Sequence, residues 1–180
     1  MRLIAPDRRY AASYRELIKE IVDAREPFIP FTLGFAHDDI DQLLATLDDH
    51  AHGRRLPEGF VPHSTFWLVS AAEIVGVSNL RHELTPALRI EGGHIGYSVR
   101  PSSRKQGFGV ELLRLTLQEA RALGLQQVLV TCGKGNLASA KVIVANGGML
   151  HSEEFVPKRN EVVQRYWIDL SRGEANATRR

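Results

Sequence analysis

The stretch that decides the fold of this 180-residue chain reads Tyr97-Ser-Val-Arg-Pro-Ser-Ser-Arg-Lys-Gln-Gly-Phe-Gly109. A strand pattern ends at Val99, Pro101 prevents its continuation, and a helical pattern begins within the pair Gly107 and Gly109. Glycines let main-chain N–H groups line a concave surface, and the helix adds unpaired donors and the positive end of its dipole. The stretch also carries three cationic side chains, those of Arg100, Arg104 and Lys105. These features together predict a pyrophosphate site, although an ordinary strand-to-helix connection has a similar local pattern.

Hydrophobic spacing on both sides of this stretch predicts further helices and strands. Upstream, apolar residues recur at helical spacing in two segments, one ending before Pro27 and one over 40–47 with Asp38 as its cap. The intervening segment 27–35 is aromatic and contains two prolines, so we expect a loop there. Strand patterns lie at 64–70, 74–81, 94–99, 127–132, 149–155 and 162–170, and helical patterns at 107–123 and 136–146. In the helix 107–123 the side expected to be buried consists of Val110, Leu113, Leu117 and Ala120.

This order of elements predicts one α+β domain over residues 1–170. A single β-α-β crossover is expected around residues 92–132, and no repeat or linker divides the chain. Residues 171–180 are polar and lack apolar periodicity, so we expect a disordered tail there.

Composition and charge exclude several classes of protein. The net charge of +2 is too small to indicate a nucleic acid or an anionic membrane as partner, and residues 1–170 are formally neutral. No apolar run approaches the ~18 residues of a membrane span, and the N-terminal segment lacks the apolar core of a secretory signal. The single Cys132 excludes an intramolecular disulfide framework, and the histidines show no metal-binding spacing. We therefore expect a cytoplasmic protein without a metal.

The order Arg104-x-x-Gly107-x-Gly109 resembles the acetyl-CoA loop of the general-control-related N-acetyltransferase (GNAT) superfamily. Two flanking segments extend the resemblance. His94-Ile-Gly-Tyr-Ser-Val99 is similar to the family's fourth strand, and Asn136-Leu-Ala-Ser139 is similar to the start of its helix beyond strand five. The resemblance implies a mixed, mostly antiparallel central sheet of six to seven strands, with helices on both faces and strand four splayed from strand five.

Two upstream segments, Ser64-Thr-Phe-Trp67 and Arg81-His-Glu-Leu, are similar to a branch of bacterial predicted acetyltransferases without an assigned substrate. By the family resemblance the co-substrate is acetyl-CoA. Main-chain groups of Tyr97 and Val99 would bind its pantetheine arm, and Asn136 and Ser139 would lie along it. Asn136 also fits the alternative role of a helix N-cap. The pyrophosphate would be held by the amides of Arg104, Lys105, Gln106, Gly107, Phe108 and Gly109.

The implied activity is acetyl transfer to a primary amine by direct attack in a ternary complex. An amine of pKa ~10.4 is mostly protonated at neutral pH, so the reaction needs a base. His94 is the first candidate, because an imidazole titrates near neutral pH, and Glu83 is the second. A hydrogen-bonded structural role is the competing interpretation of His94. Many family members carry an acidic Tyr where this chain has Ile143, which leaves a non-catalytic acyl-CoA-binding module as the alternative function.

The acceptor is less well defined, and small-molecule and peptide amines both fit. Residues 27–53 contain five aspartates and no Lys or Arg, so this stretch could attract a cationic amine; a solvated helix face is the alternative. The rings of Phe28, Phe31 and Phe35 are either a wall of the acceptor site or a cover for the core. Exposed edges of such a sheet would also permit a homodimer.

A second glycine pattern, Cys132-Gly-Lys-Gly-Asn-Leu-Ala138, has the spacing of a dinucleotide-binding turn. Fewer than fifty residues follow Gly133, which is too few for the β-α-β-α-β unit that such a site needs. We therefore interpret Cys132 as a small core residue.

Overall fold

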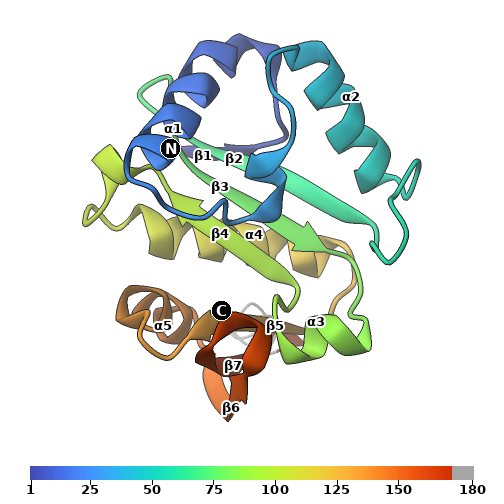
Figure 1. Ribbon diagram of the computed structural model, residues 1–180, viewed down its shortest axis with the longest axis vertical. Coiled ribbons are helices and arrows are strands. Elements are labelled where there is room, and N and C mark those ends of the chain that lie inside the picture. The colour runs from blue at the N-terminus through green and yellow to red at the C-terminus, as the bar shows by residue number, and fades with distance from the viewer. Residues whose placement is uncertain (172–180) are drawn as a thin grey trace, which may run out of the picture.

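Residues 1–171, the part of the chain that the computed structural model describes, contain both helices and strands (Figure 1). The strands of this part are β1 (Arg2–Ile4), β2 (His63–Ser70), β3 (Glu73–Arg81), β4 (Ile95–Val99), β5 (Gln127–Gly133), β6 (Met149–Val156) and β7 (Glu161–Asp169). Its α-helices are α1 (Ala11–Asp23), α2 (Ile40–Ala51), α3 (Pro86–Ile90), α4 (Phe108–Ala122) and α5 (Leu137–Ala145). The predicted α+β class is confirmed; the predicted disorder of 171–180 falls, apart from Ser171, outside the described residues.

The seven strands form two sheets, which separate between β4 and β5, where the family resemblance implies a splay within one central sheet. The first has the order β1-β2-β3-β4 and the second the order β5-β7-β6, and all pairings within them are antiparallel. The crossover through α4 brings β4 and β5 together between the two sheets. Figure 1 shows these two strands at the junction of the upper and lower halves of the molecule.

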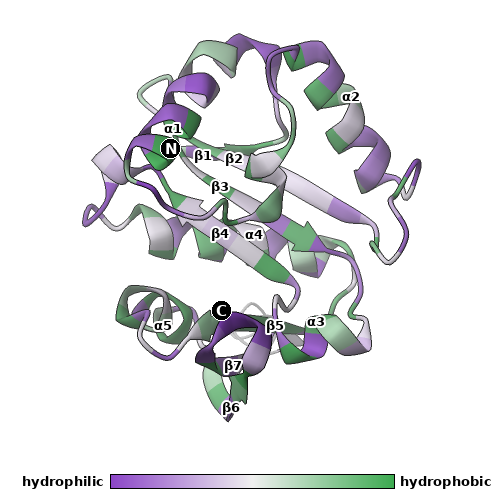
Figure 2. Cartoon of the chain, in the orientation of Figure 1, coloured by the Kyte–Doolittle hydropathy of each residue, from purple (hydrophilic) through white to green (hydrophobic). Residues whose placement is uncertain are grey.

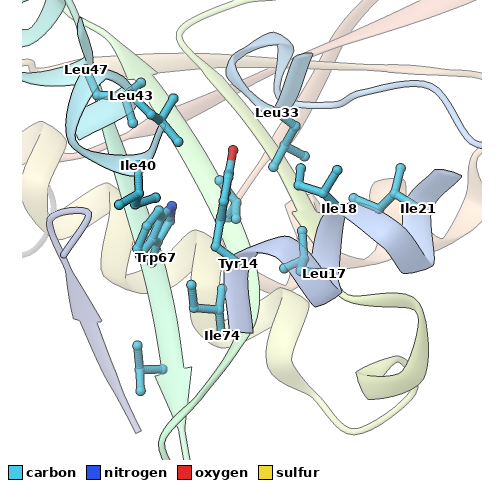
Figure 3. Packing of buried hydrophobic residues seen from close by; sticks show 12 residues of the cluster. Tyr14, Leu17, Ile18, Ile21, Leu33, Ile40, Leu43, Leu47, Trp67 and Ile74 are labelled. Atoms are coloured by element: carbon cyan, nitrogen blue, oxygen red, sulfur yellow. The ribbon is translucent and has the colours of Figure 1, made fainter. Parts of the chain in front are cut away.

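Alternation along β2 explains why helices cover both faces of the first sheet. Trp67 and Val69 point toward α1 and α2, where they pack with Tyr14, whereas Leu68 points to the opposite face and packs with Leu112 of α4. Figure 3 shows the first of these clusters, in which the rings of Tyr14 and Trp67 stack with their centroids 4.8 Å apart. Because both faces are covered, the middle of the strand, Phe66 to Val69, is a continuous apolar run rather than an alternating one.

Two helical details differ from the expected pattern. Asp39 caps α2, in place of the predicted Asp38: its carboxylate accepts hydrogen bonds from the N–H groups of Asp41 and Gln42. In α4, Val110 is exposed, and the buried side is rotated to Leu112, Leu113, Thr116, Leu117 and Ala120. The rotation arises because α4 packs against several elements, chiefly β3, β4 and α5, so its buried stripe is wider than one seam.

The short helix α3 was not expected. Pro86 occupies its first turn and the Thr85 hydroxyl accepts from the Leu88 N–H, which is a recognisable start signal for a helix. Figure 2 shows hydrophilic and hydrophobic residues on both α1 and α2, as expected for helices with one buried side. Within residues 1–171 no helix is both long and apolar enough to cross a membrane.

Candidate functional site

The strands β4 and β5 are joined at one point, which we call the vertex and define as His94 and Leu129. The His94 N–H donates to the Leu129 carbonyl at 2.7 Å, and the Leu129 N–H donates to His94 Nδ1 at 2.9 Å. A side chain at Gly93 would overlap the Leu129 carbonyl oxygen, so the close approach requires glycine at this position. Beyond the vertex the two strands form no ladder, which agrees with the predicted splay.

The edge of β4 that faces away from β3 is therefore available to a ligand. The Arg100 N–H donates to the Val75 carbonyl on β3 at 2.9 Å. Because main-chain groups alternate in direction along a strand, those of Tyr97 and Val99 point to the opposite edge. The Val99 carbonyl accepts from the Arg104 Nε at 3.2 Å, and the structure gives the Tyr97 main chain no ladder partner at that edge. These are the two residues whose main chain the sequence assigns to pantetheine.

The start of α4 presents a group of unpaired main-chain donors. Within the described part of the chain no acceptor is found for the N–H groups of Lys105, Gln106, Gly107, Phe108 and Gly109. The Arg104 N–H is partly used, since it donates to Pro101 at 3.4 Å. Gly107 is the N-cap with a φ of +84°, a left-handed conformation that favours glycine. Five free donors and the helix dipole make this turn suitable for a phosphate group.

The cationic side chains of the same stretch are arranged differently from the prediction. Arg100 is buried, and its guanidinium pairs with Glu20 at 2.7 Å and with Glu16 at 3.2 Å, both on α1. Arg104 donates to both carboxylate oxygens of Glu26, one of them at 2.6 Å. The hydrogen bond from Arg104 lowers the pKa of Glu26. Among the described residues, Lys105 is thus the cation of this stretch that has no carboxylate partner.

The helix α5 closes the opening between β4 and β5 on another side. The Asn136 side chain accepts from the Ser139 N–H at 3.0 Å, so the N-cap interpretation of Asn136 is confirmed. The Ser139 hydroxyl lies 2.9 Å from the Tyr97 hydroxyl, which ties β4 to α5. Burial raises the pKa of the Tyr97 hydroxyl. Ile143, at the position of the missing Tyr, is fully buried in the core.

The geometry of His94 favours the structural interpretation over the catalytic one. Its Nδ1 accepts the Leu129 N–H, which assigns the ring proton to Nε2 and leaves no free lone pair for a substrate proton. Burial lowers the pKa of His94 to about 4, so the imidazole is a weak base at neutral pH. Glu83, the second candidate, is exposed in the connection between β3 and α3.

The aspartates of residues 27–53 are largely occupied within the protein. Asp39 caps α2, and Asp41 pairs with Arg8 at 2.9 Å. Asp48 and Asp49 both pair with Arg54, at 2.7 and 2.9 Å. Four of the five carboxylates thus have partners, which favours the solvated helix face over attraction of a cationic amine.

Two small cavities lie on either side of Phe60, between α2 and the end of β3. The first, of about 150 Å³, is lined by Phe31, Gly59, Phe60, Val61, His63, Arg81 and Leu88. The second, of about 340 Å³, is lined by Phe35, Ala36, Gln42, Leu43, Thr46, His50, Pro57 and Phe60. Phe31 and Phe35 therefore line these cavities, and Phe35 also packs against the core cluster that contains Tyr14 and Trp67. No sequence signal marked Phe60, His63 or the Arg81 side chain as part of this region.

A splayed pair of strands with a free edge, followed by a helix start that can bind phosphate, is the arrangement of an N-acetyltransferase domain. A family model described as an acetyltransferase (GNAT) domain matches residues 15–149. The chain therefore belongs to the GNAT acetyltransferase family, and the predicted family, fold class and enzyme class are confirmed. No curated protein sequence matches the chain.

Solved structures share the fold at low sequence identity. RimJ of Mycobacterium smegmatis, in complex with a CoA disulfide, has a TM-score of 0.70 and 19% identity, with 96% of this chain and 83% of that chain covered. The Salmonella typhimurium acetyltransferase that modifies the N-terminal serine of ribosomal protein L7/L12 has a TM-score of 0.66 and 17% identity, covering 93% and 94%. A single-substitution variant of spermidine N-acetyltransferase SpeG from Vibrio cholerae has a TM-score of 0.63 and 16% identity, covering 98% and 99%. The CoA ligand of RimJ agrees with the co-substrate predicted here.

Proposed function

We propose that this protein transfers the acetyl group of acetyl-CoA to a primary amine in a ternary complex. The observation that carries the proposal is the row of main-chain N–H groups from Lys105 to Gly109, which are without acceptors among residues 1–171. It lies next to the edge of β4 at Tyr97 and Val99, which pairs with no other strand of the described chain. An extended pantetheine arm with amide groups would hydrogen-bond along that edge while its pyrophosphate sits at the helix start. The family match and the CoA bound to RimJ support the same assignment.

The proposed reaction proceeds by direct attack. The neutral amine adds to the thioester carbonyl, the C–S bond breaks, and the products are the N-acetyl amine and the CoA thiolate. The CoA thiol has a pKa of ~8.5, so its thiolate leaves without protonation by a strong acid. The buried Tyr97 hydroxyl is not needed as that acid, and burial raises its pKa. The amine proton passes to Glu83, the remaining candidate base, whose carboxylate is exposed near the end of β3.

Two measurements test this function. Acetyl-CoA should raise the melting temperature, because a ligand that binds only the folded state stabilises it, and an amine panel should release free CoA thiol. An unchanged melting temperature at saturating acetyl-CoA would refute the proposed binding site. Replacing Glu83 by Gln should lower kcat/KM at neutral pH, and undiminished turnover at every pH would remove Glu83 as the base.

A non-catalytic acyl-CoA-binding module is the second candidate, and the observation that favours it is the apolar Ile143 at the usual position of the acid. Both candidates predict stabilisation by acetyl-CoA. They differ in thiol release, which only the enzyme produces in the presence of an amine.

The boundaries of the domain, its cytoplasmic location and a homodimer stay predictions. A chain ending after Leu170 should retain acetyl-CoA binding if residues 1–170 suffice for the site. Sedimentation of the full chain would determine the oligomeric state.

A further inference from the structure

The cavity of about 150 Å³ contains a guanidinium that has no carboxylate partner among residues 1–171. Arg81 lies over the Phe31 ring, with its Cζ 5.1 Å from the ring centroid. One nitrogen, Nη1, donates to the carbonyls of Gly92 and Gly93 at 3.2 and 3.1 Å, and burial lowers the pKa of the guanidinium. The two buried arginines, Arg100 and Arg165, by contrast, each pair with a carboxylate. Arg81 is half-buried, and a partly desolvated cation without a counter-charge favours an anionic ligand.

A buried donor without an acceptor, on His63, lines the same cavity. The Asn79 side-chain amide donates to His63 Nδ1 at 2.9 Å, so the proton of this neutral ring is on Nε2. His63 is only 1% exposed, and its Nε2 has no hydrogen-bond partner. A buried donor without an acceptor costs free energy, and an oxygen of a bound ligand would satisfy it.

The remaining walls of this cavity are apolar, and its size suits one small group. Phe31 and Phe60 meet edge to face with centroids 5.4 Å apart, and Val61 and Leu88 complete the lining. A dry cavity of this volume in other proteins holds a benzene ring. Among residues 1–171 no carboxylate lines either cavity, so these walls offer no counter-charge to a polycation.

This cavity adjoins the vertex, beside which the acetyl group would lie when pantetheine binds along β4. Arg81 contacts the carbonyls of Gly92 and Gly93, directly before His94 of the vertex, and its own N–H donates to the His94 carbonyl at 2.7 Å. On the other side, Pro30 lies against Gly96 of β4, and the following Phe31 contacts Arg81 at the end of β3. An acceptor in the cavity would thus have its amine close to the strand that binds pantetheine.

We infer that the acceptor is a small amine with a carboxylate on an apolar frame, such as an aromatic or branched aliphatic amino acid, and not a polyamine. This inference rests on the proposed function. Arg81 and His63 would bind the carboxylate, and Phe31, Phe60 and Leu88 would surround the apolar side group. The amine would then be directed toward the acetyl group at the vertex.

The test compares matched amines with and without the carboxylate. We would measure CoA thiol release with phenylalanine against 2-phenylethylamine, with leucine against 3-methylbutylamine, and with spermidine. The expected kcat/KM favours each amino acid over its decarboxylated partner by about ten- to a hundredfold, the range for a hydrogen bond to a charged group. Spermidine should be the poorest acceptor.

Variants locate the preference. Arg81→Gln should bring the ratio of the two kcat/KM values near one, whereas Arg89→Gln, which removes an exposed cation from α3, should leave it unchanged. Because the ratio is taken within each variant, a reduced fraction of folded protein cancels. The inference is overturned if decarboxylated amines or spermidine react as well as the amino acids, if only other amines react, or if Arg81→Gln keeps the wild-type ratio. If acetyl-CoA does not bind and no amine causes release of CoA thiol, the proposed function itself is refuted instead.

Discussion

Acidification should destabilise the protein through two buried histidines, His63 and His94. Burial lowers the pKa of each imidazole to about 4, from the ordinary value of 6.5. His63 is 1% exposed and His94 is 6% exposed, so solvent cannot hydrate the charged rings in the folded state. The unfolded chain therefore binds more protons than the folded chain between these pKa values. Stability is present above pH 6.5 and is lost as the pH falls toward 4.

The magnitude follows from the two pKa values. At pH 5 each histidine costs about 2 kcal/mol relative to pH 7, or about 4 kcal/mol for both. That is a large part of a typical free energy of unfolding, and for a chain of this length it corresponds to roughly 10 °C in melting temperature. The paired carboxylates contribute mainly at lower pH, because unfolded acids titrate near pH ~4.

Urea unfolding at pH 7, 6 and 5, followed by tryptophan fluorescence, measures this loss. His94→Asn keeps an oxygen that can accept the Leu129 N–H but cannot titrate, so it should recover about 2 kcal/mol of the decline. His63→Asn should recover a similar amount, and the exposed His151→Asn, the matched control, should follow the wild type. A wild-type stability that is flat from pH 7 to 5, or an unchanged slope in both buried-site variants, would refute the assignment.

Three further outcomes are expected. Gly107→Ala should lower the free energy of unfolding by about 1 kcal/mol and raise the KM for acetyl-CoA. Space is available at this position, but a φ of +84° is strained for alanine. Urea unfolding measures the first effect and thiol release the second. Asp39→Ala should lower the free energy of unfolding by about 1 kcal/mol and Asp38→Ala should not, since only Asp39 caps α2; equal losses would contradict the cap assignment. Alkylation of Cys132 by iodoacetamide should be slow, because burial raises the pKa of its thiol, and it should be slower still with acetyl-CoA bound. If acetyl-CoA does not slow the alkylation, the ligand binds elsewhere.

The candidate site divides into parts that were predictable and parts that were not. The turn at Gly107 and the cap at Asn136 follow local rules, in which one residue and its near neighbours decide the backbone, and both appear as expected. The roles of Arg100 and His94 do not follow from such rules. Their partners, Glu20 and Leu129, are far away in the sequence, and nothing in the local pattern indicates them.

The resemblance of its motifs was enough to assign the family. The sequence by itself also determined most of the helices and strands and the turn that we propose binds phosphate, because glycine, proline and hydrophobic spacing act on the backbone locally. Only the tertiary structure decided which charges remain unpaired. Arg104 is a cation in the sequence and half of an ion pair in the fold, whereas Arg81, to which the sequence assigned no role in a site, has no carboxylate partner among the described residues. The physical reason is that neutralisation and burial depend on the path of the whole chain. The cavity that we propose for the acceptor, formed by residues between Phe31 and Leu88, is a product of that path.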